Sequence, residues 1–241
     1  ASEAPTAGMD ASQLTAAMNA EESLSRLKSA QEAITELSIP AVPIVLINGA
    51  LQQSYVLDYR NMNDTVGLIL LGQKQFTECP PFAVDASKQY IATIETEKGN
   101  IVMQLFPDKA PLAVNSFVFL ARQGWYNGVT FHRVIPGFAA QAGDPSGTGR
   151  GNPGYLFKNE SSELLFTKPG MVGMANSGPD TNGSQFFITL DTHPELDGNY
   201  TIFGHVLSGM DMLAELSTPD SNQDSLPAEG NAIITIIIEE R

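Results

Sequence analysis

The N-terminal third of the chain begins with a helical pattern of apolar and polar positions. From Asp10 to about Leu37, apolar or small side chains recur every three or four residues, which predicts an amphipathic helix ending before Pro40. The next predicted elements are a buried strand over 44–47, a turn at Asn48-Gly49, a returning strand over 53–58 and a short helix over 63–71. This order predicts a small α/β segment.

After residue 88 the pattern becomes alternating, as in half-buried strands. Segments 90–95 and 101–106 alternate around Lys98-Gly99-Asn100 and predict a hairpin. Helices are predicted over 111–123, closed by Gly124, and over 210–216. The apolar run 233–238 predicts a strand buried on both faces. Short strands separated by turn residues favour a β-barrel.

Composition favours one medium-sized domain with an extension. The chain has 241 residues and 42% hydrophobic content, as in ordinary soluble proteins. A proline-bearing stretch lies between the two patterns. We therefore predict an N-terminal arm over 1–78, a linker over 79–87 and a C-terminal domain over 88–241.

Charge and apolar content limit the partners. A net charge of −14 argues against nucleic acid and anionic membranes, which attract basic surfaces. The sequence has no run of about 20 apolar residues, so no membrane insertion is expected. The single cysteine, Cys79, cannot form an intrachain disulfide. The start at Ala1 indicates either a removed signal segment or an excised fragment. The location is left unknown by the sequence, and an extracytoplasmic one (secreted or cell envelope) is favoured.

One arginine among aromatic rings and amides is the candidate for chemistry. Arg133 lies in the run Phe-His-Arg-Val-Ile-Pro-Gly-Phe at 131–138, and segments 174–179 and 182–188 supply further amides and rings. A guanidinium presents five donors in a rigid fork and can act on an uncharged peptide. Neither a nucleophilic triad nor a metal-ligand spacing stands out. A reaction without nucleophile, metal or cofactor is favoured.

From about residue 90 to 241 the chain resembles the cyclophilins, which are peptidyl-prolyl cis-trans isomerases. The matching blocks, in the family's order, are Phe131-His132-Arg133, Pro136-Gly137-Phe138, Gln141, Gly143-Asp144, Met174-Ala175-Asn176, 181–187 and Leu196-Asp197-Gly198. The resemblance implies a mostly β fold, a closed antiparallel barrel with two capping helices. It also implies rotation about X-Pro bonds in protein chains, assisting folding, with proline-containing peptides and unfolded or partly folded proteins as partners.

The chemistry of such an isomerase can be stated physically. Amide resonance opposes rotation with a barrier of about 18 to 20 kcal/mol. A donor aimed at the prolyl nitrogen stabilises the pyramidal nitrogen of the twisted state, so it lowers the barrier without merely tightening binding. Arg133 is our candidate for that donor.

The resemblance implies supporting roles for the other matched residues. Phe138, Phe187 and Leu196 would form the walls of the proline pocket. Gln141 would orient Arg133 and contact substrate, and Gln185 would line the floor of the pocket. The peptide backbone next to the proline would be bound by Ala175, Asn176 and Ser177. His132 would lie at the rim, either as a direct substrate contact or as a structural histidine bonded to nearby backbone.

Three positions depart from the pattern common in the family. Ala139 replaces a methionine, Glu195 a tryptophan and Tyr200 a histidine. Ala139 should widen the proline pocket. Glu195 removes the indole that supports cyclosporin binding in this family, so weak cyclosporin sensitivity is expected. Tyr200 keeps an aromatic face, so we expect that pocket wall to survive.

The N-terminal arm resembles the second half of a thioredoxin-like domain, with Pro43 at the position of that family's cis-proline. The half that would carry the redox Cys-x-x-Cys is absent. Half such a sheet leaves apolar surface uncovered, so we expect it to pack on the C-terminal domain, on a second copy or on chain missing here. A structural or partner-docking arm is expected.

A glycine-rich run also matches the pattern of a dinucleotide-binding motif. Run 149–154 matches Gly-x-Gly-x-x-Gly, but neither a strand nor a helix flanks it, so a glycine-rich surface loop beside the groove is expected instead of a dinucleotide site.

The isomerase hypothesis stands beside two others. These are a proline-peptide binding module with little catalysis, and an isomerase fold that serves as a scaffold for the arm.

Overall fold

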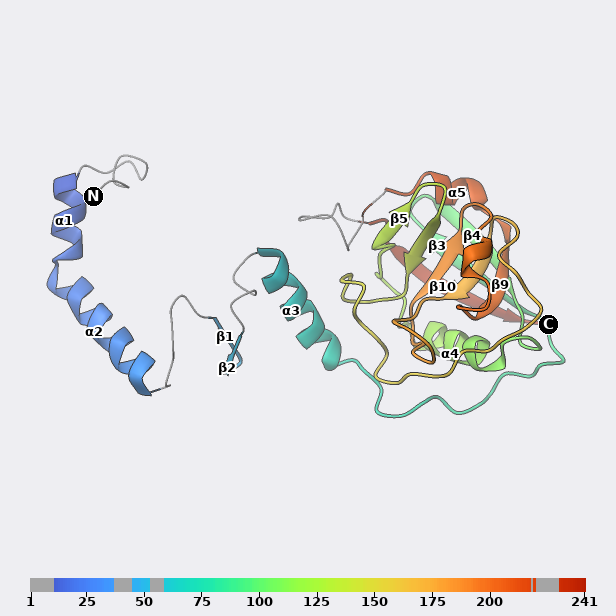
Figure 1. Ribbon diagram of the computed structural model, residues 1–241, viewed down its shortest axis with the longest axis horizontal. Helices are drawn as coiled ribbons and strands as arrows, with labels where there is room; N and C mark the ends of the chain where they lie inside the picture. Colours follow the sequence, from blue (N-terminus) through green and yellow to red (C-terminus); the bar gives the residue numbers. More distant parts are fainter. Residues whose placement is uncertain (1–10, 37–44, 53–58, 218, 220–229) are drawn as a thin grey trace. The chain divides into compact units, whose positions relative to one another are not determined.

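The computed structural model describes residues 11–36, 45–52, 59–217, 219 and 230–241. By its contacts the chain divides into two compact units, 1–57 and 58–241 (Figure 1). The second unit thus begins at residue 58, before the predicted linker over 79–87. The role of that linker as a domain boundary stays a prediction. None of the described helices combines the length and apolarity needed to cross a membrane.

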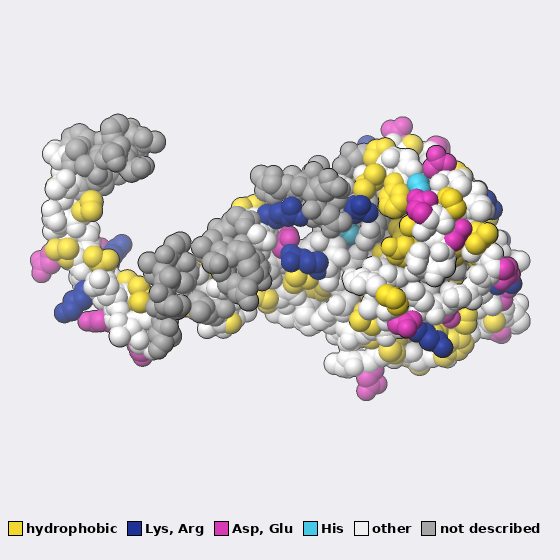
Figure 2. Space-filling view, viewed as in Figure 1, with side chains coloured by type: hydrophobic (Ala, Val, Ile, Leu, Met, Phe, Trp, Pro, Cys, Tyr) yellow, Lys and Arg dark blue, Asp and Glu magenta, His cyan; other side chains and the backbone are white. Residues whose placement is uncertain are grey.

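In the first unit, the predicted long helix is two helices, α1 (Ala11–Met18) and α2 (Glu21–Glu36). Asn19 is a poor helix former, and two acidic residues in the first turn of α2 favour a new helix start there. Leu24 and Leu27 on α2 are 51% and 58% exposed. Figure 2 shows hydrophobic and charged side chains next to one another on this N-terminal segment. Within the described part of the first unit, no residue of α2 is buried.

A small hairpin follows with its turn where predicted, but the first strand is not buried, since Leu46 is 46% exposed, and the returning strand comes earlier than predicted. Strands β1 (Leu46–Ile47) and β2 (Ala50–Leu51) pair in antiparallel register. Asn48 and Gly49 have φ angles of 51° and 79°, the positive values that a two-residue primed turn requires. The predicted strand over 53–58 and Pro43 lie outside the described residues.

The second unit contains one curled antiparallel sheet with helices. Its elements are α3 (Tyr59–Gly72), β3 (Tyr90–Thr96), β4 (Gly99–Leu105), α4 (Pro111–Arg122), β5 (Arg133–Ile135), β6 (Ala139–Ala142), β7 (Met171–Met174), β8 (Phe186–Thr189), η2 (Pro194–Leu196), β9 (Ile202–Ser208), α5 (Met210–Ala214) and β10 (Ile233–Glu240). The eight strands are ordered β10-β3-β4-β9-β7-β8-β6-β5. An isolated bridge between Thr130 and Ala232 joins the segments beside the two edge strands. The predicted mostly β architecture with helices is confirmed. The predicted closed barrel is not, because β10 and β5 end the ladder and, among the described residues, this isolated bridge and not a strand ladder joins the segments beside them.

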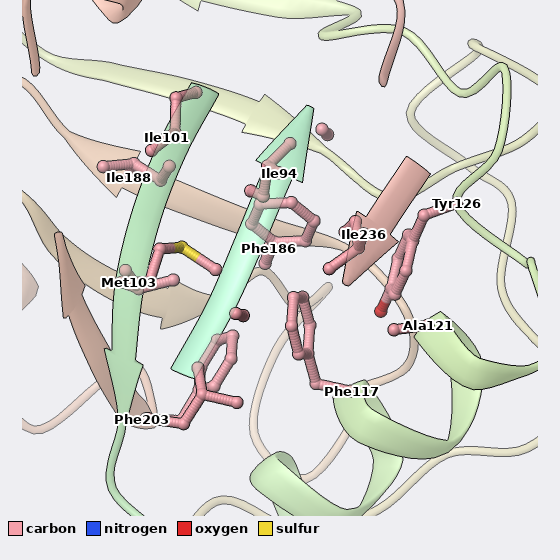
Figure 3. Close-up of a cluster of buried hydrophobic side chains, with 14 of the residues drawn as sticks. Ile94, Ile101, Met103, Phe117, Ala121, Tyr126, Phe186, Ile188, Phe203 and Ile236 are labelled. Atoms are coloured by element: carbon pink, nitrogen blue, oxygen red, sulfur yellow. The ribbon is translucent and has the colours of Figure 1, made fainter. Parts of the chain in front are cut away.

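The main core lies between the inner face of this sheet and α4 (Figure 3). Phe117 on α4 packs its ring 5.2 to 5.4 Å from the rings of Tyr126, Phe186 and Phe203. The helix is apolar on this side, begins with Pro111 and ends before Gly124, which has a φ of 69°. These local signals agree with the predicted helix.

The prediction that the last strand is buried on both faces was wrong. Ile233 and Ile236 are buried in β10, but Ile234 and Ile237 are 53% and 46% exposed. The strand lies at an edge of the sheet and carries a register shift between Ile233 and Thr235. A continuous apolar run therefore does not show burial on both faces, because only the tertiary structure decides what covers each face.

Residues between α3 and β3 are tied to the same unit. Asn115 on α4 accepts hydrogen bonds from the N–H groups of Ala83 and Val84 at 2.8 and 3.3 Å, and its amide donates to the carbonyl of Pro81 at 3.1 Å. Residues 81–84 of the predicted linker are thus hydrogen-bonded to α4 through Asn115.

Candidate active site

The predicted site residues meet on the outer face of the sheet. In the strand ladder, Arg133 on β5 lies opposite Gln141 on β6, and Gln141 lies opposite Phe187 on β8. Phe187 in turn lies opposite Gly173 on β7. Side chains alternate between the two faces of a strand, so cross-strand partners share a face. The neighbours Val134 and Ala140 are buried in the main core instead.

These side chains surround a hollow of about 270 Å³. It is lined by His132, Arg133, Phe138, Ala139, Gln141, Gly149, Ala175, Asn176, Phe187, Leu196 and Tyr200. All but Gly149 were predicted as site residues. Two others, Ser177 and Gln185, line an adjoining hollow of about 200 Å³ that shares Gln141, Gly149, Ala175 and Asn176 with the first.

A small apolar cluster supports the first hollow from below. Phe187 stacks on Phe166 with ring centroids 5.5 Å apart and meets Tyr200 edge to face at 5.3 Å. Ala139 and Leu196 belong to the same cluster. An added Cβ at Gly173 would lie 2.6 Å from Phe187 Cζ, so glycine is what lets the ring lie flat on the strand.

The guanidinium of Arg133 lies against an aromatic ring. Its Cζ atom is 5.9 Å from the centroid of Phe138, within cation–π range. The ring of Phe138 is held in turn by His193, which meets it edge to face at 4.8 Å. An apolar wall and a permanent cation therefore face the same hollow, which suits a ligand with an apolar ring beside an amide.

Glu195 has a role of its own at the rim of this hollow. Its carboxylate lies 2.8 Å from His193 Nδ1, while His193 Nε2 lies 3.0 Å from the carbonyl of Gly137. Its own backbone N–H and then the His193 ring lower the pKa of Glu195. Glu195 thus fixes the histidine that supports Phe138.

The amides of the two hollows form a linked set. Gln141 Nε2 donates to Gln185 Oε1 at 2.9 Å, and Gln185 Nε2 donates to the carbonyls of Gly149 and Gly151 at 3.0 and 2.8 Å. Asn176 donates to the carbonyl of Asn199 at 3.3 Å and accepts from the N–H of Gly178 at 3.2 Å. Each amide is oriented before a ligand arrives.

His132 is more buried than the predicted rim position implies. It is 4% exposed, and burial lowers its pKa, an effect that outweighs the opposing field of Asp144. Burial therefore favours the neutral form of this imidazole. Among the described residues no group of His, Cys, Asp and Glu is arranged to hold a metal ion.

Two contributors to the site were missed by sequence reasoning. Phe166 and Gly173 shape the position of Phe187, yet neither belongs to the quoted motifs. Gly149 belongs to the glycine-rich run 149–154, which was the available signal for a loop beside the groove. That run is no free surface loop, because Gly151 and Pro153 are buried.

Comparison with known proteins matches the C-terminal part of the chain. Residues 91–237 match the family model described as cyclophilin type peptidyl-prolyl cis-trans isomerase/CLD. The match does not reach the N-terminal arm, so it lends no support to the thioredoxin-like interpretation.

Curated relatives include "Peptidyl-prolyl cis-trans isomerase-like 1" of Emericella nidulans, 44% identical over 152 residues, covering 61% of this chain and 94% of the relative. The Homo sapiens protein of that name is 46% identical over 145 residues, covering 58% and 87%.

Solved structures give the same result. A cyclophilin type peptidyl-prolyl cis-trans isomerase of Cryptosporidium parvum has a TM-score of 0.58 and 37% identity, covering 63% of this chain and 98% of that one. A second structure of that protein, in the presence of the dipeptide Ala-Pro, has a TM-score of 0.57 and 37% identity, covering 62% and 98%.

Proposed function

We propose that this chain, which belongs to the cyclophilin-type peptidyl-prolyl cis-trans isomerase family and isomerises X-Pro bonds, uses Arg133 as the donor to the prolyl nitrogen. The observation that carries the proposal is the shared hollow. Arg133 and the apolar walls Phe138 and Phe187 line the same space of about 270 Å³. A proline ring seated there would hold its own nitrogen near the guanidinium.

The mechanism follows from amide electronics. In the planar ground state the prolyl nitrogen shares its lone pair with the carbonyl, and it regains that lone pair as the bond twists. A hydrogen bond from Arg133 is strongest to the twisted state, so it lowers the barrier selectively. A fixed cation in a partly dry hollow is also strengthened by the lower local dielectric.

The other amides supply binding and orientation in this proposal. Gln141 lies directly across from Arg133 in the strand ladder, which supports a role in orienting it and contacting substrate. Asn176, with Ala175 and Ser177, would bind the peptide backbone next to the proline. Gln185 lines the adjoining hollow and holds Gln141. His132 lines the hollow, yet it is 4% exposed and neither ring nitrogen has a hydrogen-bond partner among the described residues, so a direct substrate contact and a structural role are both kept as proposals.

Substrates and partners of this chain are proposed at the level of chemical class. They are proline-containing peptides in unfolded or partly folded proteins, in line with the related structure obtained in the presence of Ala-Pro. Weak cyclosporin sensitivity stays a prediction, since Glu195 stands where the family often has the supporting indole. The arm remains a proposed docking segment, and its thioredoxin-like ancestry a hypothesis.

Substitution of Arg133 tests the central proposal. We expect Arg133→Ala to lower kcat/KM for a short alanine-proline peptide by roughly 100- to 1000-fold, the range for removing one transition-state donor. The matched control is Arg122→Ala, an exposed arginine on α4 that pairs with Glu240 at 3.2 Å. Wild-type kcat/KM in the folded Arg133→Ala protein would refute the donor role.

A further inference from the structure

Residues 59–76 pack against the glycine-rich run beside the site. We call residues 59–76 the brace and residues 149–154 the groove loop. Asp64 pairs with the guanidinium of Arg150 at 2.7 Å. Gln75 Nε2 donates to the backbone and side-chain oxygens of Asn152 at 3.0 and 3.2 Å, and the N–H of Phe76 donates to the carbonyl of Pro153 at 2.8 Å. The brace thus holds the groove loop along its length.

Glycines make this close approach possible. An added Cβ at Gly154, which has a φ of +95°, would collide with the carbonyl oxygen of Phe76. An added Cβ at Gly151 would lie 2.6 Å from Leu71 Cδ2 and would collide with Asp144. Two of the three glycines that suggested a dinucleotide motif, Gly151 and Gly154, therefore permit close contact between the loop and the brace.

The brace is itself anchored in the core of the second unit. Leu71 is 4% exposed and belongs to the main hydrophobic cluster. The ring of Phe76 packs 5.1 Å from Phe119 and 5.9 Å from Trp125. The Asp64 side chain is 16% exposed and that of Arg150 is 56% exposed, so this pair is only partly shielded from solvent.

From the groove loop the contacts continue into the site. The carbonyls of Gly149 and Gly151 receive both donated bonds of Gln185, whose oxygen accepts from Gln141. Gly149 lines both hollows, and Arg150 and Asn152 line the adjoining one. A shift of the groove loop would therefore reorient Gln185 and change the wall that faces residues flanking the proline.

We infer that the brace, which lies outside the stretch 91–237 matched to the family, is a positioning element of the substrate groove. It holds the groove loop where its carbonyls orient Gln185 and where its side chains face the residues next to the proline. The inference rests on the proposed use of the first hollow for the proline ring. It assigns the recognition of flanking residues in part to a segment that precedes the matched domain.

The test uses the full chain with the double substitution Asp64→Ala and Gln75→Ala, which removes the side-chain bonds to the groove loop and changes no residue that lines either hollow. Two ligands are titrated by NMR, a blocked Ala-Pro dipeptide and a peptide with three residues on each side of one proline. We expect Kd for the longer peptide to rise about 3- to 10-fold, as for loss of a partly buried pair, and Kd for the dipeptide to stay within about twofold. The side-chain amide signals of Gln141 and Gln185 should shift before ligand is added.

The matched control is Glu240→Gln, which breaks the ion pairs with Lys88 and Arg122 instead and should change neither Kd. Unchanged binding of both ligands by the double variant would overturn the inference, and so would equal weakening of both, which indicates general destabilisation. Binding is measured and not turnover, so failure of the Arg133 proposal would leave this result interpretable.

Discussion

Gly173 offers a sharp test of how the proline hollow is built. It lies on β7 opposite Phe187 on β8. An added Cβ would be 2.6 Å from Phe187 Cζ, 2.9 Å from Phe187 Cε1 and 3.0 Å from Phe166 Cζ. Its φ is not among the positive values, so Gly173→Ala is allowed by the backbone and its effect is steric.

The size of the effect can be worked from these distances. Phe187 Cζ must move by about 0.8 Å to reach an ordinary contact of 3.4 Å. Phe166 and Tyr200 pack against the ring on other sides and resist that movement. Overpacking of this kind costs about 1 to 3 kcal/mol of unfolding free energy. A displacement near 1 Å at a site costs up to roughly 100-fold, so kcat/KM should fall about 10- to 100-fold.

The assay measures kcat/KM for a short alanine-proline peptide and unfolding in urea, at a temperature where the variant is folded. Gly204→Ala on β9 is the control, because its added Cβ would lie 2.8 Å from the carbonyl oxygen of Gln104 and 3.3 Å from Leu105 Cδ2, outside the hollow. It should lose stability and keep its activity. Wild-type kcat/KM in Gly173→Ala would refute the idea that Phe187 is a fixed wall of the hollow.

Two further predictions concern stability. Burial lowers the pKa of His132, so below the unfolded value of about 6.5 the unfolded chain binds a proton that the native state excludes. The unfolding free energy should therefore fall with decreasing pH, and this group should contribute up to about 1.4 kcal/mol per pH unit. The measurement is urea unfolding of wild type and His132→Asn across this pH range. Equal dependence of the unfolding free energy on pH in the two proteins would contradict the prediction. Asn115→Ala removes the bonds to Pro81, Ala83 and Val84 and should lower the unfolding free energy by about 2 kcal/mol in denaturant titrations. A loss under about 0.5 kcal/mol would show that this contact contributes little.

Local sequence patterns predicted several elements well. The hairpin around Lys98-Gly99-Asn100 and the helix closed by Gly124 depend on residues close in sequence, such as turn glycines and a proline at a helix start. The helix predicted from Asp10 to Leu37 failed at Asn19, where periodicity continued but helix propensity was weak. The periodicity of apolar residues indicates which side chains could share one face of a helix. It does not indicate whether the helix is continuous.

The sequence alone determined the class of chemistry through the blocks that resemble the cyclophilins, and its alternating segments agreed with the mostly β architecture that this resemblance implies. Only the tertiary structure decided that Gly173 lies under Phe187, that Ile234 and Ile237 face outward, and that residues 59–76 hold the loop at 149–154. These facts depend on pairing between segments far apart in the chain. A strand's pattern specifies its two faces, but the packing of distant segments selects what each face meets.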